Sequence, residues 1–230
     1  MNAVVSTITQ LLPAEIITTD PEQITLYSQD VFTVGPPICA VVRPRNIDEV
    51  QALVRACLER GTPIVTRGGG MSYTSGYIAS APDSVLIDMA SMDAIVEVNL
   101  EDRYVTVEAG CSWQKLHEHL APLGVRTAYW GTLSGRYATV GGGLSQNSIF
   151  WGSGQSGTAA DNVLSVSVVT GKGDLLETGS AAQQHAAPFT RHFGPDLTGV
   201  FLGDCGALGI KVRATLPLVP LAGAKGYTSF

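Results

Sequence analysis

The sequence reads Thr66-Arg67-Gly68-Gly69-Gly70-Met71-Ser72-Tyr73-Thr74-Ser75-Gly76 directly after a short apolar run at residues 63–65. The apolar run is typical of a β-strand, so the glycines begin where a strand ends. Consecutive glycines adopt positive φ without a Cβ clash, and they let a ligand approach the bare backbone. Successive N–H groups in such a turn point into one concavity, which suits a phosphate or a diphosphate. The stretch therefore predicts a phosphate-binding turn, with a flexible surface loop as the alternative.

A second glycine-rich segment lies within residues 131–163. Its centre, expected to be another glycine turn, reads Thr139-Val140-Gly141-Gly142-Gly143-Leu144-Ser145-Gln146-Asn147. Residues 152–157 also satisfy G-x-G-x-x-G, but that dinucleotide fingerprint requires a strand before it and a helix after it. Here a strand follows, at 163–169, so a Rossmann fold is rejected, and no Walker A motif occurs. Two such segments without either motif favour a different nucleotide-binding fold.

The composition describes a folded domain with little charge. The chain has 230 residues, of which 45% are hydrophobic and 15% are charged, and its formal net charge is −6. This acidic balance argues against a nucleic-acid partner, which would require a basic face. No apolar run approaches membrane-spanning length and no signal peptide is recognisable, so we expect a cytoplasmic protein without a membrane span. The spacing of the four cysteines and four histidines predicts neither a disulfide framework nor a metal site.

Helix and strand signals predict an α+β fold with an N-terminal segment and two lobes. Residues 1–37 are expected to hold a helix near Val4–Leu12, followed by an irregular stretch through Asp30. In the first lobe, residues 38–90, two strands flank a helix that Asn46 caps and Gly61 ends. This strand–helix–strand unit would deliver the first glycine loop.

The second lobe is expected to span residues 91–220. Short alternating runs predict strands at 94–98, 105–108, 163–169, 175–177 and 210–218, in addition to one at 85–87. Helices are expected at 112–120 and 197–202. A turn at 171–174 should fold the strand at 163–169 back into a hairpin.

Both glycine segments, together with a third motif, resemble the FAD-linked oxidases with the vanillyl-alcohol-oxidase-type FAD-binding domain. The third motif runs from Asp196 to Ile210 and ends in Gly206-Ala207-Leu208-Gly209-Ile210. Within that family, the motifs are most similar to the branch of D-lactate dehydrogenase and the D subunit of glycolate oxidase, over roughly residues 38–220. The resemblance implies FAD as cofactor, extended between a small strand–helix–strand lobe and a larger lobe with a mixed or antiparallel sheet and flanking helices.

The resemblance also implies which residues contact FAD. The first loop would hold the diphosphate, and the second segment would line the cofactor or approach it through the backbone. The expected contacts are Arg67, Gly68, Gly69, Gly70, Met71, Ser72, Gly76, Thr132, Leu133, Ser134, Thr139, Gly142, Gly143, Ser145, Asn147, Gly157, Asp161, Asn162, Val163 and Ile210. Arg67 could instead clamp loop carbonyls, and Asp161 could be a turn acid. Thr139 and Ser145 could be helix caps.

Departures from the family pattern predict noncovalent FAD. Met71 stands where several relatives attach the flavin through a histidine, and Tyr137 stands where others attach it through a cysteine. Bulky residues 149–150 replace a glycine pair, and Cys205 replaces an acidic residue, so a rearranged ring site is possible.

The family also has a cap domain that covers the flavin and supplies the substrate pocket. Residues 221–230 would be at most its start, so the cap is expected on a second chain. The expected function is the FAD-binding subunit of an oxidoreductase that oxidises a small hydroxy acid or alcohol by hydride transfer to flavin N5. A flavin electron-transfer subunit and a scaffold that has lost FAD are the alternatives. No catalytic residue is assigned, because Arg136, His185 and His192 lie in no motif.

Overall fold

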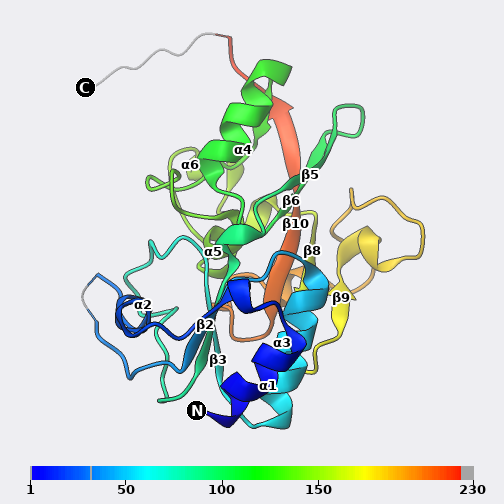
Figure 1. Ribbon diagram of the computed structural model, residues 1–230. Helices are drawn as coiled ribbons and strands as arrows, with labels where there is room; N and C mark the ends of the chain where they lie inside the picture. The colour runs from blue at the N-terminus through cyan, green and yellow to red at the C-terminus, as the bar shows by residue number, and fades with distance from the viewer. Residues whose placement is uncertain (1, 32, 224–230) are drawn as a thin grey trace.

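The computed structural model describes residues 2–31 and 33–223, and two β-sheets surrounded by helices form its framework (Figure 1). The smaller sheet contains, in spatial order, β1 (Ile17–Thr18), β2 (Ala40–Val42), β4 (Val85–Asp88) and β3 (Ile64–Arg67). The larger sheet contains β5 (Ile95–Asn99), β6 (Tyr104–Glu108), β10 (Ile210–Pro220), β8 (Ser165–Val169) and β9 (Leu175–Glu177), with β7 (Val125–Thr127) paired to β10. The α+β class is therefore confirmed.

The smaller sheet contains the strand–helix–strand unit that the sequence predicts. β2 and β3 both pair in parallel with β4, and α3 (Ile47–Glu59) connects them. The Asn46 side chain accepts a hydrogen bond from the backbone N–H of Glu49 (2.9 Å), which is the expected N-cap. Leu53 on the apolar stripe of α3 is fully buried. β3 ends at Arg67, so the first glycine loop starts at the edge of this sheet.

The N-terminal segment joins this sheet. α1 (Ala3–Leu11) packs its buried residues against α3, and β1 pairs antiparallel with β2. A second helix, α2 (Pro21–Tyr27), occupies part of the stretch that was expected to be irregular, so that expectation was wrong. Asp20 caps α2 by accepting a hydrogen bond from Gln23 N–H (3.0 Å), and proline occupies the first helical position. Both features are helix-start signals.

The larger sheet is antiparallel at each of its pairings, and β10 is its central strand. β8 and β9 form the predicted hairpin, and α4 (Trp113–Leu120) begins at the expected cap, Ser112. β7 was not predicted. The remaining helices are α5 (Val140–Ser145), α6 (Ser153–Ser156) and α7 (Leu197–Val200), with 3-10 turns at Ala14–Ile16, Met89–Ser91, Ala121–Leu123, Ala160–Asn162 and Gly179–Ala182.

A shared core fixes the two sheets relative to each other. Val169, Ile210 and Val212 of the larger sheet belong to the same buried cluster as α1 and α3. The side chains of Gln51 and Arg55 on α3 donate hydrogen bonds to the carbonyl O of Gly173 in the β8–β9 turn (2.7 and 2.9 Å). Figure 1 shows α3 lying beside the lower ends of these strands. The lobe boundary expected at residue 90 falls within the turn Met89–Ser91 that leads from β4 to β5.

Two expectations concern what the fold lacks. No helix within residues 2–31 and 33–223 combines the length and apolar character needed to cross a bilayer. Within the same residues, no group of three or more His, Cys, Asp or Glu side chains could hold a metal ion. The expected start of a cap domain falls mainly on residues 224–230, which lie outside the described residues.

Candidate cofactor cleft

A cleft of about 470 Å³ lies where the two lobes meet. Its wall combines the loop after β3, the segment around α5 and the loop before β10. The expected FAD contacts on this wall are Gly68, Gly69, Gly70, Met71, Ser72, Gly76, Thr132, Leu133, Ser134, Thr139, Gly142, Gly143 and Ser145. The fold therefore brings both glycine segments to one cavity, and the third motif contributes Cys205, Gly206 and Gly209.

The two glycine segments pack directly against each other. A Cβ added to Gly69 would overlap the carbonyl O of Tyr137, and a Cβ added to Gly68 would overlap Thr139 Oγ1. The sequence explained these glycines by the approach of a ligand. The structure gives them a different role, because only a residue without a side chain lets the second segment come this close.

The second segment forms a helix where a glycine turn was expected. Thr139 Oγ1 accepts a hydrogen bond from Gly142 N–H (3.2 Å) and caps α5, which is the alternative role left open for Thr139. A Cβ on Gly141 would lie 2.7 Å from Ala109 Cβ, and one on Gly143 would lie 3.0 Å from Trp113 Nε1. A Cβ on Gly142 would meet only Thr139 Oγ1, at 3.1 Å. Gly142 therefore presents backbone to the open cleft, while its two neighbours pack against protein.

Arg67 lies behind the first loop and not on the cleft wall. Its guanidinium carbon is 4.6 Å from the centroid of the Tyr27 ring and 5.5 Å from that of Tyr77. The Tyr77 hydroxyl donates a hydrogen bond to the carbonyl O of Gly70 (2.9 Å). Cation–π contacts with these two rings help to hold the guanidinium in place. Neither contact involves a loop carbonyl, and Arg67 Nε is buried without a hydrogen-bond partner among the described residues, so both roles of Arg67 stay predictions.

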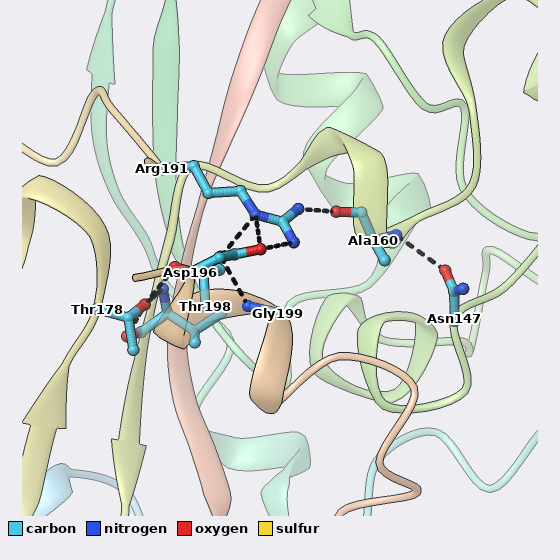
Figure 2. Close-up of polar contacts among 8 residues, drawn as sticks. Asn147, Ala160, Thr178, Arg191, Asp196, Thr198 and Gly199 are labelled. Carbon is cyan, nitrogen blue, oxygen red and sulfur yellow. Dashed lines mark hydrogen bonds and ion pairs between the residues drawn. The ribbon is translucent and has the colours of Figure 1, made fainter. Parts of the chain in front are cut away.

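The expected contacts Asn147, Gly157, Asp161, Asn162 and Val163 lie beside the cleft, outside its wall. Asn147 Oδ1 accepts a hydrogen bond from the N–H of Ala160 at 3.0 Å (Figure 2). Asp161 Oδ2 accepts hydrogen bonds from the backbone N–H (2.7 Å) and hydroxyl (2.8 Å) of Thr158, and these bonds hold the pKa of Asp161 below its usual value. They favour the turn-acid role for Asp161. Backbone contact between this segment and a cofactor stays a prediction.

Arg191 is a supporting residue that the sequence did not reveal. Its guanidinium donates to both carboxylate oxygens of Asp196 (Nε–Oδ1 3.1 Å, Nη2–Oδ2 2.8 Å) and to the carbonyl O of Ala160 (Figure 2). The pair holds the pKa of Asp196 below its usual value. Asp196 also caps α7 by accepting from Gly199 N–H (3.0 Å). Arg191 thus ties the turn beside the cleft to the start of the third motif.

A buried ion pair joins the third motif to the residue that follows it. Lys211 Nζ lies 2.6 Å from Asp204 Oδ1, and the two side chains are 3% and 2% exposed. Asp204 also accepts hydrogen bonds from the N–H groups of Gly206 (3.0 Å) and Leu208 (3.3 Å). Burial lowers the pKa of Lys211, and the bond to Asp204 opposes this shift. Adjacent strand residues face opposite sides, so Ile210, an expected FAD contact, is buried in the core while Lys211 lines the cleft.

Comparison with known proteins adds to this geometry. Residues 38–179 match the family described as FAD binding domain. The chain belongs to this FAD-binding family. The match includes both glycine segments and the turn at 157–163, and it confirms the resemblance to FAD-linked oxidases.

Two curated relatives belong to the expected branch. The FAD-binding chain is 34% identical over 178 residues to the mitochondrial D-lactate dehydrogenase (cytochrome) of Arabidopsis thaliana, a match that covers 77% of this chain and 30% of that protein. It is 31% identical over 181 residues to glycolate oxidase subunit GlcD of Bacillus subtilis (strain 168), a match that covers 79% of this chain and 37% of that protein. The chain therefore spans well under half the length of these relatives.

Solved structures show the same fold. The FAD-binding chain superposes on alkyldihydroxyacetonephosphate synthase with a TM-score of 0.82 at 20% identity, covering 96% of this chain and 44% of that one. It superposes on p-cresol methylhydroxylase with a TM-score of 0.82 at 21% identity, and this match covers 96% of this chain and 44% of that one. At these identities, the comparison shows the architecture alone.

The cleft wall fits FAD chemically. The cofactor has an anionic diphosphate, and the wall offers the hydroxyls of Ser72, Thr132 and Ser134 together with bare backbone at Gly142. Among the described residues, Lys211 is the one charged side chain that lines the cleft, and no carboxylate does. Hydroxyl and amide donors facing a cation-bearing wall suit a phosphate group. When bound, FAD would supply a two-electron acceptor.

The mouth of the cleft is apolar and open. Leu133 and Ile149 on the wall are 80% and 73% exposed, and Met71 and Tyr73 are also exposed. Arg136, His185 and His192 do not line the cleft, so no catalytic residue is assigned in this FAD-binding chain.

Proposed function

We propose that this chain is the FAD-binding subunit of an oxidoreductase that oxidises a small hydroxy acid or alcohol. The observation that supports this most is the meeting of three family motifs on one cleft. The names of the curated relatives, D-lactate dehydrogenase and glycolate oxidase subunit GlcD, support the substrate class. Hydride transfer from the hydroxyl-bearing carbon to flavin N5 would be the chemical step.

Noncovalent attachment of FAD is part of the proposal. Met71 and Tyr137 offer neither an imidazole nor a thiol at the two positions where relatives attach the flavin. Met71 lines the cleft, and the backbone of Tyr137 packs against Gly69. Denaturation of the protein should therefore release FAD in chemically unchanged form.

A second chain would complete the substrate pocket. The exposed apolar rim of Met71, Tyr73, Leu133 and Ile149 supports this, because contiguous apolar surface marks a contact site. We also propose the cytoplasm as the compartment. The four cysteines are free, which fits a reducing environment. The mitochondrial name of one relative makes that organelle the alternative.

A flavin electron-transfer subunit is the second candidate. One observation favours it: no carboxylate or histidine of the described residues lines the cleft to accept the proton of a substrate hydroxyl. The substrate reaction would then belong entirely to another subunit.

Anaerobic reduction separates the two candidates. The purified chain loaded with FAD is mixed with D-lactate or glycolate, first alone and then with the proteins that copurify with it from the native source. The subunit proposal predicts bleaching of the flavin absorbance by a hydroxy acid when the second chain is present. It also predicts intact FAD in the supernatant after denaturation. Flavin that is bleached by dithionite but by no hydroxy acid in either mixture would contradict it and favour the carrier.

A further inference from the structure

Within residues 2–31 and 33–223, the cleft wall holds one cation, in a chain with a net charge of −6. An anionic ligand therefore meets few groups that could balance its charge. Lys211 of β10 is one of the residues that line the wall, and its side chain, which carries the ammonium paired with Asp204, is only 3% exposed. The ammonium has three donors, and within the described part of the chain only the bond to Asp204 is formed. Two donors remain for a ligand.

Asp204 holds the ammonium in place but accepts only one of the three hydrogen bonds that the ammonium can donate. The Asp204 carboxylate shares its charge among Lys211 and the backbone N–H groups of Gly206 and Leu208. Two backbone donors therefore bind the carboxylate in addition to the ammonium. The same three bonds fix the loop before β10. The ammonium is thus preorganised, and its desolvation cost is met during folding and not during binding.

A buried ion pair stabilises a fold weakly, because both charges lose their hydration on burial. Well-packed apolar residues of similar volume often serve as well or better, so a buried pair at a cavity wall calls for a role in the cavity. The diphosphate of a flavin dinucleotide is the anionic part of the ligand proposed above, and charge-assisted bonds to phosphate are strong.

We propose that the ammonium of Lys211 binds the diphosphate of FAD, with Asp204 as its positioning partner. This inference rests on the proposed FAD function. It places a charged diphosphate contact directly after the third motif, in addition to the glycine loop after β3.

The test compares the unaltered chain with a variant that lacks both charges of the ion pair. The double variant Lys211→Met/Asp204→Asn contains neither an unpaired buried carboxylate nor an unpaired buried ammonium. Affinities for FAD and for riboflavin, which lacks phosphate, are measured by fluorescence titration. Circular dichroism and thermal melting without ligand verify folding. FAD should bind about 10- to 100-fold more weakly to the double variant than to the unaltered chain, while riboflavin affinity stays equal.

A conservative variant gives a second measurement. Lys211→Arg keeps a cation opposite Asp204, so its ratio of FAD to riboflavin affinity should stay well above that of the double variant. Equal FAD affinity for the unaltered chain and the double variant, or an equal loss for FAD and riboflavin, would overturn the role of Lys211. Failure of the unaltered chain to bind FAD would instead overturn the proposed function itself.

Discussion

Replacing Gly69 with alanine is expected to lower the free energy of unfolding by about 2–3 kcal/mol, the upper part of the usual range for overpacking. The new Cβ would overlap the carbonyl O of Tyr137, a backbone atom that cannot rotate away. The two glycine segments would have to separate, and both line the cleft. FAD affinity should therefore fall at least about tenfold, equivalent to roughly 1.4 kcal/mol. Urea unfolding and a fluorescence titration with FAD measure the two effects.

Gly154→Ala is the matched control. Gly154 lies in α6, and a Cβ there has no atom within 4 Å. Alanine is the better helix former, so this variant should be neutral or more stable by up to about 1 kcal/mol, with unchanged FAD affinity. If Gly69→Ala is as mild as this control, the contact between the two segments does not shape the cleft.

Replacing Trp113 with alanine is expected to cost about 3–5 kcal/mol of unfolding free energy. Trp113 is 5% exposed, and its ring meets that of Tyr129 edge-on with centroids 5.4 Å apart. It also supports the backbone of the cleft wall: a Cβ on Gly131 would lie 2.6 Å from Trp113 Cγ, and one on Gly143 would lie 3.0 Å from Nε1. Loss of the indole would leave a cavity behind two wall segments. Urea unfolding followed by circular dichroism measures the cost.

Trp113→Phe separates volume from hydrogen bonding. The indole Nε1 is buried without a hydrogen-bond partner among the described residues, so phenylalanine removes an unsatisfied donor and retains most of the packing. A loss of about 1–2 kcal/mol is expected for this variant, clearly less than for alanine. Equal losses for the two variants would show that ring volume is not what holds the wall.

Local sequence signals were sufficient to predict α3 and β3 in the smaller lobe. Asn46 and Gly61 marked the ends of α3, and the apolar run before Arg67 marked β3, because caps and strand ends depend on neighbouring residues. The helix start at Asp20-Pro21 was also readable but was missed.

Contacts between distant segments could not be predicted from local patterns. Gly68 and Gly69 were recognised as special, yet their reason lies at residues 137–139, about seventy residues away in the sequence. Arg191 binds Asp196 and Ala160 at a spacing that matches no motif. Lys211 was overlooked because a lysine inside an apolar strand pattern gives no sign of its partner. In each case, the tertiary fold supplies the second member of the contact.

The most direct test of the central claim is a titration of the folded chain with FAD, monitored by flavin fluorescence. Gly142 presents bare backbone to the cleft, and an added Cβ would meet only Thr139 Oγ1, at 3.1 Å, so Gly142→Leu should fill part of the cavity after a small shift of that hydroxyl. The account predicts saturable binding of one FAD per chain, weakened at least about tenfold by Gly142→Leu. A folded chain that shows no saturable binding of FAD, or a Gly142→Leu variant that binds FAD as tightly as the unaltered chain, would contradict it.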